Sequence, residues 1–340
     1  MPALTLFSIV TLLPVPLLAL AATNGGIWVA LAFGYMTVLV FALDEIVRRV
    51  TPALPEAEFP AADLLSVALA LSHFGLLVLT LVALGGDTLS TFGKIGLLAS
   101  LGLFFGQVSN ANAHELIHKS NRTLHRLGMW VYISLLFGHH TSAHVLVHHR
   151  LVATHDDPSS ARLGESSYRF FVRAWVGSFR EGYRAEAARL ARVGRSWLHN
   201  PYALYLGGSI LFLVAAFALG GWKALIGYLV LCLHAQAQLI LTDYVQHYGL
   251  ARPARPNGKP ATVNAHHSWN SPHWFSSALM LNGPRHSDHH AHPTRPFPSL
   301  EIAEGSPMLP RALPLMVCLA LAPGLWRRVM DPRARKWLAT

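Results

Sequence analysis

The sequence predicts an all-α integral membrane protein in which six transmembrane helices carry a histidine-rich cytoplasmic cap. Three observations predict this fold class: six apolar runs of helical length, basic residues confined to one set of loops, and histidines gathered on that same side. The chain of 340 residues is 52% hydrophobic and only 13% charged. Apolar runs of helical length in such a chain indicate membrane-spanning helices.

The six apolar runs define the predicted spans. A hydrocarbon core about 30 Å thick requires roughly 20 residues of helix, with about 17 as the lower limit. A signal peptide over residues 1–21 is an alternative for the first run, which ends in LLALAA, but no Lys or Arg precedes that run. The last two runs form a helical hairpin that turns at Gly220 and Gly221. The spans cover approximately residues 4–21, 27–43, 64–84, 91–113, 203–220 and 222–242.

Lys and Arg residues orient these spans. If the N-terminus is inside, the outer loops contain only Lys223 of the 27 Lys and Arg residues, and Lys94 lies just within the fourth span. Because cytoplasmic loops carry the basic excess, this predicts a multi-pass protein of a bacterial-type inner membrane. The polar segments 114–200 and 243–306 then form the cytoplasmic cap. The membrane topology and anionic lipid head groups account for the net charge of +10. A surface for an acidic partner protein is the second interpretation of this charge. No nucleic-acid partner is expected.

The C-terminal residues 307–340 are predicted to form an interfacial tail, separate from a membrane domain of residues 1–306. The apolar run of this tail, about residues 313–324, is too short to cross a membrane and contains Pro314 and Pro323. Cys232 and Cys318 are predicted to be small buried hydrophobic residues without a disulfide bond.

Four motifs concentrate histidines on the inner side. HELIHK follows the fourth span directly, so His114 and His118 lie at i and i+4 on one face of a continued helix. HVLVHHRLVATHDDP repeats this spacing, and its adjacent His148 and His149 point about 100° apart, which suits two metal ions or two sides of one centre. DYVQHYGL and RHSDHHAH complete the set. The nine histidines are His114, His118, His144, His148, His149, His247, His286, His289 and His290.

Nine imidazoles at these spacings indicate metal binding. One zinc site takes four ligands, so nine exceed one metal and fit two ions of four or five ligands each. Imidazole suits zinc, copper, iron and nickel, and the ligand type alone does not choose among them. Taken by itself, HELIHK also fits a zinc protease with Glu115 as general base, and a zinc-dependent or metal-carrying membrane protein is the corresponding alternative.

At these motifs the chain closely resembles the membrane-bound alkane hydroxylases (alkane 1-monooxygenases) of the fatty acid desaturase/hydroxylase superfamily. The matching motifs are HELIHK, HHRLVATHDDPSSARLGES, DYVQHYGL and HSWNSPHWFSSALMLNGPRHSDHHAHPTRPFPSL, and with the spans they cover about residues 5–305. The resemblance implies a non-haem di-iron centre held by the nine histidines, with no haem, no flavin and no catalytic group beyond the metal centre. It also implies O2 as a substrate, with electrons from a separate rubredoxin and its reductase, because the chain has no CxxC pair.

The resemblance implies hydroxylation of the terminal methyl group of a medium- or long-chain alkane to a primary alcohol. Ala143 stands where the family usually has Glu, and Gln246 replaces a carboxylate while Asp243 adds one. Such changes beside metal ligands can alter redox tuning or substrate preference. The alternatives are hydroxylation of aromatic or terpenoid methyl groups and desaturation of fatty acyl chains. The residues expected beside the ligands are Glu115, Asp243, Gln246, Asp288, His273 and His292.

Overall fold

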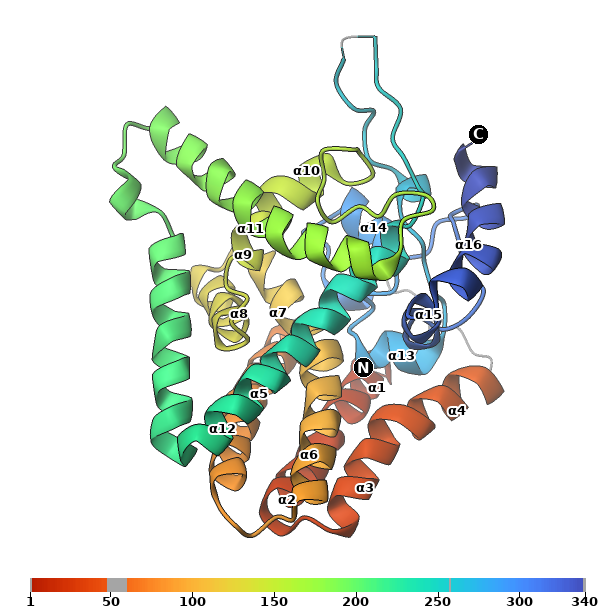
Figure 1. The fold of residues 1–340 in the computed structure, drawn as a ribbon. Coiled ribbons are helices and arrows are strands. Elements are labelled where there is room, and N and C mark those ends of the chain that lie inside the picture. The colour runs from red at the N-terminus through yellow and green to blue at the C-terminus, as the bar shows by residue number, and fades with distance from the viewer. Residues whose placement is uncertain (1, 48–59, 257, 339–340) are drawn as a thin grey trace.

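The computed structural model describes residues 2–47, 60–256 and 258–338, and five helices in this part of the chain are long and apolar enough to cross a membrane (Figure 1). The first four contain the first four predicted spans and extend beyond them by one to four residues at several ends. The helices are Leu4–Asn24 (α1 Pro2–Leu12 and α2 Pro14–Asn24), Ile27–Ile46 (α3 Ile27–Gly34, the π-helical η1 Tyr35–Leu39 and α4 Val40–Ile46), Ala61–Gly85 (α5 Pro60–Gly85), Thr91–Ile117 (α6 Thr91–Phe104, the π-helical η2 Phe105–Ser109 and α7 Asn110–Ile117) and α12 Tyr202–His247. Arg48 and Arg49, which helped to orient the spans, lie outside the described residues.

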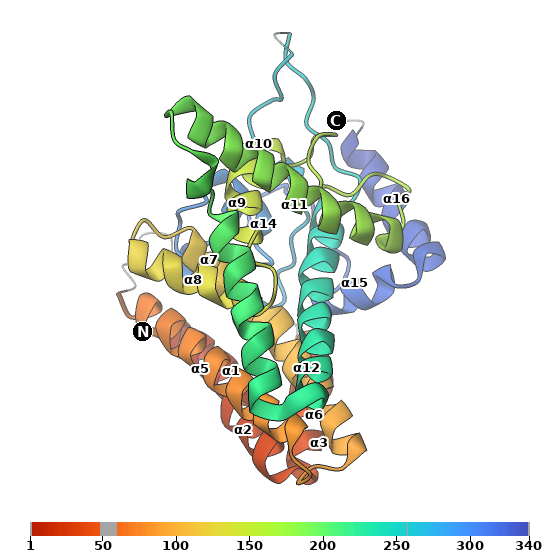
Figure 2. The same cartoon turned by 60° about the vertical axis from the view of Figure 1, so that its left-hand side comes forward.

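The fifth helix, α12, consists of two arms joined by a sharp turn. Gly220 (φ −152°, ψ 19°) and Gly221 (φ 62°, ψ −155°) interrupt its helical backbone, so the turn predicted at these glycines is confirmed. Figure 2 shows the two arms diverging from this turn. Gly221 adopts a positive φ that side chains with a Cβ disfavour. The turn also packs closely on α5, because a Cβ added to Gly85 would overlap the Cα of Gly220.

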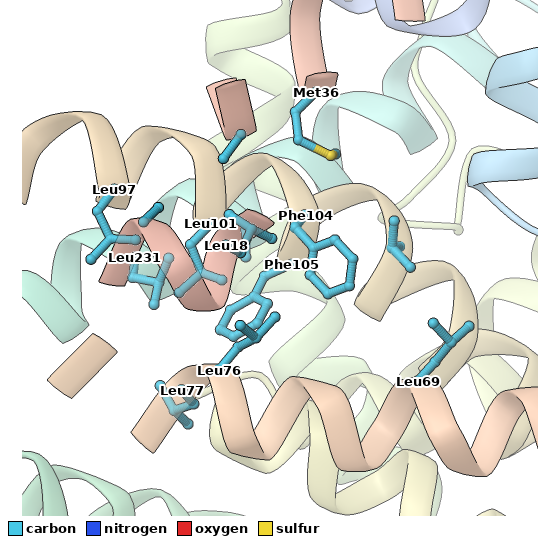
Figure 3. Close-up of a cluster of buried hydrophobic side chains, with 14 of the residues drawn as sticks. Leu18, Met36, Leu69, Leu76, Leu77, Leu97, Leu101, Phe104, Phe105 and Leu231 are labelled. Atoms are coloured by element: carbon cyan, nitrogen blue, oxygen red, sulfur yellow. The ribbon is translucent and has the colours of Figure 1, made fainter. Parts of the chain in front are cut away.

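The interior of the bundle is apolar, and so are its outer faces. Leu76 of α5 packs with Leu101 and Phe105 of the fourth helix in the buried cluster that Figure 3 shows. The outward faces of both α12 arms also carry exposed aliphatic side chains, including Ile210 and Val230. Exposed apolar surface of this extent requires a lipid environment, and the chain is therefore a membrane protein.

The cap covers the end of the bundle opposite the α12 turn (Figure 1). The described residues contain no β-strand, only two isolated bridges, Ala254–Pro260 and Asn270–Met308, so the all-α prediction is confirmed for this part of the chain. The remaining elements are α8 Arg122–Ser134, α9 His140–Ala143, the π-helical η3 His144–His148, α10 His149–Leu151, α11 Ser167–Arg192, η4 Trp197–His199, η5 Ala265–His267, α13 Trp274–Leu279, α14 His286–Ala291, η6 Phe297–Ser299, α15 Leu313–Ala320 and α16 Pro323–Leu338.

The C-terminal tail packs on the cap end of α12. Trp326 of α16 is buried and its ring lies 5.2 Å from the rings of Tyr244 and Tyr248. The Tyr248 hydroxyl donates a hydrogen bond of 2.6 Å to Asp331, which ties α16 to the residue after α12. Cys232 is buried as predicted, but the prediction for Cys318 was wrong. Cys318 is exposed, because α15 turns a different face inward.

Candidate metal centre

The structure brings all nine predicted histidines into two adjacent groups. In each group, one nitrogen atom from every ring lies within 4.8 Å of the others. The groups form where α7, η3, α10, α14 and the end of α12 meet at the cap end of the bundle (Figure 1). Group one contains His114, His118, His144, His149 and His289, and group two contains His148, His247, His286 and His290.

A π-helical turn decides how the second motif is divided. In the π-helix of η3 the backbone bonds run from i to i+5, so the turn is wider than an α-helical one. His144 therefore lies beside His149, with 2.9 Å between their Nε2 atoms, and both belong to group one. His148 belongs to group two. The adjacent His148 and His149 thus face different groups, which is one of the two arrangements that the offset between neighbouring helical side chains allows.

Helix α14 is shared between the groups in the same way. His286 and His290, one helical turn apart, face group two with their Nε2 atoms 3.1 Å apart. His289 faces group one, and its Nε2 atom lies 3.1 Å from that of His149. His247, the last residue of α12, completes group two at 3.0 Å from His286. Three short elements, η3, α10 and α14, and the ends of two long apolar helices therefore hold both groups.

The nitrogen atoms at the centre of each group fit a metal ion better than a hydrogen-bond network. His118 Nε2 and His148 Nε2 are buried without a hydrogen-bond partner, and the Nε2 atoms of His114 and His144 approach to 2.7 Å. A neutral imidazole has one donor and one acceptor, so several converging acceptor atoms cannot all be satisfied by one another. Ligand nitrogens about 2.1 Å from a shared ion are separated by about 3.0 to 3.4 Å. The donor set therefore fits one ion in each group.

Burial keeps these imidazoles neutral. Burial, followed by neighbouring imidazoles, lowers the pKa of His118 to about 4. Burial, followed by neighbouring imidazoles, also lowers the pKa values of His144, His149, His286, His289 and His290 well below 6.5. Because a neutral imidazole presents a lone pair, these side chains are ready to bind a metal at neutral pH.

Asp157, which the sequence did not single out, orients His148. Its Oδ2 atom accepts hydrogen bonds from His148 Nδ1 at 2.8 Å and from the Ser160 hydroxyl at 2.6 Å, and its Oδ1 accepts the Ser159 N–H at 3.0 Å. Burial lowers the pKa of His148, but the Asp157 carboxylate outweighs this and raises the pKa above its usual value. The hydrogen bond to Asp157 holds a proton on Nδ1, so Nε2 is the nitrogen that faces group two and is available to a metal. The sequence feature that could have pointed to this contact is the second Asp of HDDP, which is Asp157.

The residues expected beside the ligands divide into two sets. Asp243 and Gln246 line a cavity that also touches His114, His144 and His286. The other four residues expected beside the ligands belong to neither histidine group, and each contacts a partner outside the two groups. Glu115 pairs with Lys119 at 2.9 Å, Asp288 binds Arg295 at 2.7 Å and the half-exposed His292 at 2.8 Å, and His273 lies 2.9 Å from the Ser271 hydroxyl. Since Glu115 is held by Lys119, its geometry does not favour the general base of a zinc protease.

Two cavities lead away from the histidines. The smaller, about 80 Å³, touches both groups, through His114 and His144 of group one and His286 of group two. The larger, about 650 Å³, lies among η1, α4, α12 and α15 and includes the exposed Phe41. Gln107, Thr242, Met280 and Leu313 line both cavities. The two spaces are therefore adjacent, one against the histidines and the other reaching the outer face of the bundle, and these side chains lie between them.

Comparison with known proteins shows one consistent set of relatives. The family model for fatty acid desaturases matches residues 90–318, which carry all four histidine motifs. The chain is 34% identical over 323 residues to alkane 1-monooxygenase 2 of Pseudomonas aeruginosa, covering 92% of this chain and 85% of that protein. It is 32% identical over 323 residues to alkane 1-monooxygenase 1 of Alcanivorax borkumensis, covering 93% and 80%. It is 28% identical over 331 residues to the xylene/toluene monooxygenase hydroxylase component XylM of Pseudomonas putida, covering 92% and 84%.

Proposed function

This chain belongs to the alkane 1-monooxygenases of the fatty acid desaturase family, and on that premise we propose that it hydroxylates the terminal methyl group of medium- or long-chain alkanes to primary alcohols. The observation that carries the proposal is the pair of adjacent cavities that extends from the outer face of the bundle to the histidine groups. An alkane offers no polar group to bind, so selectivity must come from the shape of an apolar cavity. The narrow inner cavity admits a chain end and excludes the middle of a chain.

The two groups would hold two iron ions, with the five histidines of group one for one ion and the four of group two for the other. When bound, iron supplies O2 activation and the insertion of one oxygen atom into a C–H bond. Burial keeps imidazoles such as that of His118 neutral, and Asp157 holds a proton of His148 on Nδ1. Met280 and Leu313, at the junction of the cavities, align the alkyl chain toward the histidines. The apolar walls exclude water from the reacting carbon.

The chain crosses the membrane six times, with its cap and histidines facing the cytoplasm. The two α12 arms, residues 202–219 and 222–247, are about 27 and 39 Å long at about 1.5 Å per residue, so each is long enough to cross or nearly cross the hydrocarbon core. The basic residues concentrate on the cap side, which favours an inner membrane with a cytoplasmic cap. Residues 1–306 form the membrane di-iron domain and residues 307–340 the interfacial tail. Electrons come from a separate rubredoxin and its reductase, which meet the enzyme on the cytoplasmic side.

Isotope labelling tests the reaction. Membranes supplied with 18O2, rubredoxin, its reductase and octane or hexadecane are expected to form the primary alcohol with one labelled oxygen atom. A desaturase with the same metal centre would form an alkene without label, and that product would overturn the proposal. The purified protein is expected to contain about two iron atoms per chain. One tightly bound zinc ion would overturn the di-iron assignment.

Hydroxylation of an aromatic methyl group is the second candidate, because XylM is among the relatives. Ala143 and Gln246 also depart from the usual alkane hydroxylase pattern near the histidines. In the same assay with p-xylene, label at the benzylic carbon without alkane turnover would keep the reaction type and replace the substrate class. Turnover of alkanes alone would exclude the second candidate.

A further inference from the structure

Helix α11 presents a partly exposed apolar stripe at the border between cap and bundle. Its inward face is buried at Ala174, Ser178 and Gly182. A second face carries five side chains at spacings of three and four residues that are 36 to 61% exposed. These are Tyr168, Val172, Trp175, Phe179 and Tyr183. Aromatic side chains on one face with arginines beside them are typical of a helix that lies in a membrane interface.

A hollow of about 340 Å³ lies between this stripe and the first arm of α12. Its wall is mostly apolar and is formed by Trp175 and Phe179 of α11 and by Tyr205 and Leu206 of α12. His139 also lines the hollow. None of its lining residues also lines the two cavities next to the histidine groups. The hollow is therefore a space separate from the proposed substrate path.

An exposed apolar track continues from this hollow along α12. Leu206, Ile210 and Val214 follow one another at intervals of four residues and are 51, 60 and 59% exposed. Side chains at this spacing share one face of a helix. The face from residue 206 to the exposed Phe217 is about 17 Å long at about 1.5 Å per residue, close to half of a hydrocarbon core about 30 Å thick. One acyl chain of a lipid leaflet matches this length.

Arg180 supplies a positive charge at the same hollow. Among the described residues it has no ion-pair or hydrogen-bond partner, and no acidic residue lines the hollow. Other arginines of α11 are paired, for example Arg184 with Glu181 at 2.7 Å and Arg189 with Glu186 at 2.9 Å. A guanidinium group beside an apolar wall is complementary to a phosphate group that carries acyl chains.

We propose that this hollow binds an anionic phospholipid of the cap-side leaflet, with its phosphate on Arg180 and one acyl chain along Leu206, Ile210 and Val214. The proposal rests on the membrane placement of α12 given above, and it is independent of the metal and the reaction. The bound lipid would cover the place where α11 contacts the second α12 arm. Trp175 donates a hydrogen bond of 2.9 Å to Gln236 of the second α12 arm, and His139 directly precedes the helix that leads to His144.

Native mass spectrometry of the purified full-length protein in detergent tests this site. The wild-type protein is titrated with phosphatidylglycerol and, separately, with phosphatidylcholine of the same acyl chains. We expect phosphatidylglycerol to bind about five-fold more tightly than phosphatidylcholine, because this ratio corresponds to the attraction between one Arg and one anionic lipid head group. Arg180→Gln should abolish this preference, whereas the matched control Arg184→Gln, one turn further along the same helix, should retain it. Equal loss in both variants would mean that surface charge alone attracts the lipid and would overturn the proposal.

A second measurement locates the lipid and does not depend on either variant. Phosphatidylglycerol with a photoreactive diazirine in one acyl chain should crosslink to the α12 peptide that contains Leu206 and Ile210. Crosslinking confined to other spans, or displacement of the probe by palmitate as readily as by phosphatidylglycerol, would overturn the phospholipid assignment. Neither measurement involves O2 or alkane. Failure of the proposed hydroxylation would therefore leave both results unchanged.

Discussion

Changing Asp157 to Asn removes the charge that orients one imidazole of group two. Asp157 accepts hydrogen bonds from His148 Nδ1 at 2.8 Å and from the Ser159 N–H at 3.0 Å. If the Asn oxygen keeps the backbone N–H, its NH2 group faces His148 and donates to Nδ1. The imidazole proton then moves to Nε2, the atom that faces the other histidines. Loss of a charge-assisted hydrogen bond costs about 1.5 to 3 kcal/mol, and loss of such a partner lowers metal affinity roughly ten- to hundred-fold.

Iron analysis after dialysis against increasing chelator concentrations measures this effect. We expect the wild-type protein to retain about two irons per chain where Asp157→Asn retains about one, because group one keeps all of its contacts. Asp156→Asn is the matched control, since the neighbouring Asp156 is exposed, and it should behave as wild type. Retention of both irons by Asp157→Asn at every chelator concentration, or an equal loss in the control, would refute the orienting role.

Three further predictions concern the ligands, the bundle and pH. His289→Ala should lose the iron of group one, whereas His292→Ala, which is half exposed and bonded to Asp288, should keep both irons, and iron analysis distinguishes the two. Gly85→Ala should destabilise the protein by about 1 to 3 kcal/mol, because its Cβ would overlap the Gly220 Cα, and an unchanged Tm in detergent would contradict this. The metal-free protein should become less stable as the pH falls below 6.5, because the folded state holds buried imidazoles such as His118 unprotonated, with a pKa of about 4, while the unfolded chain binds the proton. Each such group contributes about 1.4 kcal/mol per pH unit between those limits, and equal Tm values at pH 7.5 and 5.5 would contradict it.

The spans and the family could be predicted from the sequence because both depend on local signals. A membrane helix is an uninterrupted apolar run, and the turn at Gly221 requires a backbone conformation that glycine adopts freely. The four motifs carried the family, which the comparisons confirm. The continuation of the fourth helix through HELIHK is confirmed, since this helix runs to Ile117 and carries His114 within it. Its backbone hydrogen bonds continue past the point where the side chains become polar.

The division of the histidines into two groups could not be predicted from spacing. In a regular α-helix His144 and His148 lie on one face, and they would share a metal. The π-helical turn instead places His144 with His149. No residue type marks a π-turn, so the sequence carries no direct signal for it. The role of Asp157 was missed for a similar reason, since its contact with His148 depends on the fold of the loop between them.

The two groups differ in the charge that surrounds them, although both use imidazole alone. Asp157 and Asp243 both act on the charge of His148 in group two. The groups that influence His118, His144 and His289 of group one are other histidines. The carboxylates near His148 would therefore partly neutralise a divalent ion held by group two without binding it. Asp243 stands one helical turn before His247 and adds a carboxylate near group two, whereas Ala143 and Gln246 stand where the resemblance places two carboxylates. The three departures together leave one carboxylate fewer beside the histidines, so the surroundings of the two groups depend more on Asp157, which holds His148 of group two alone.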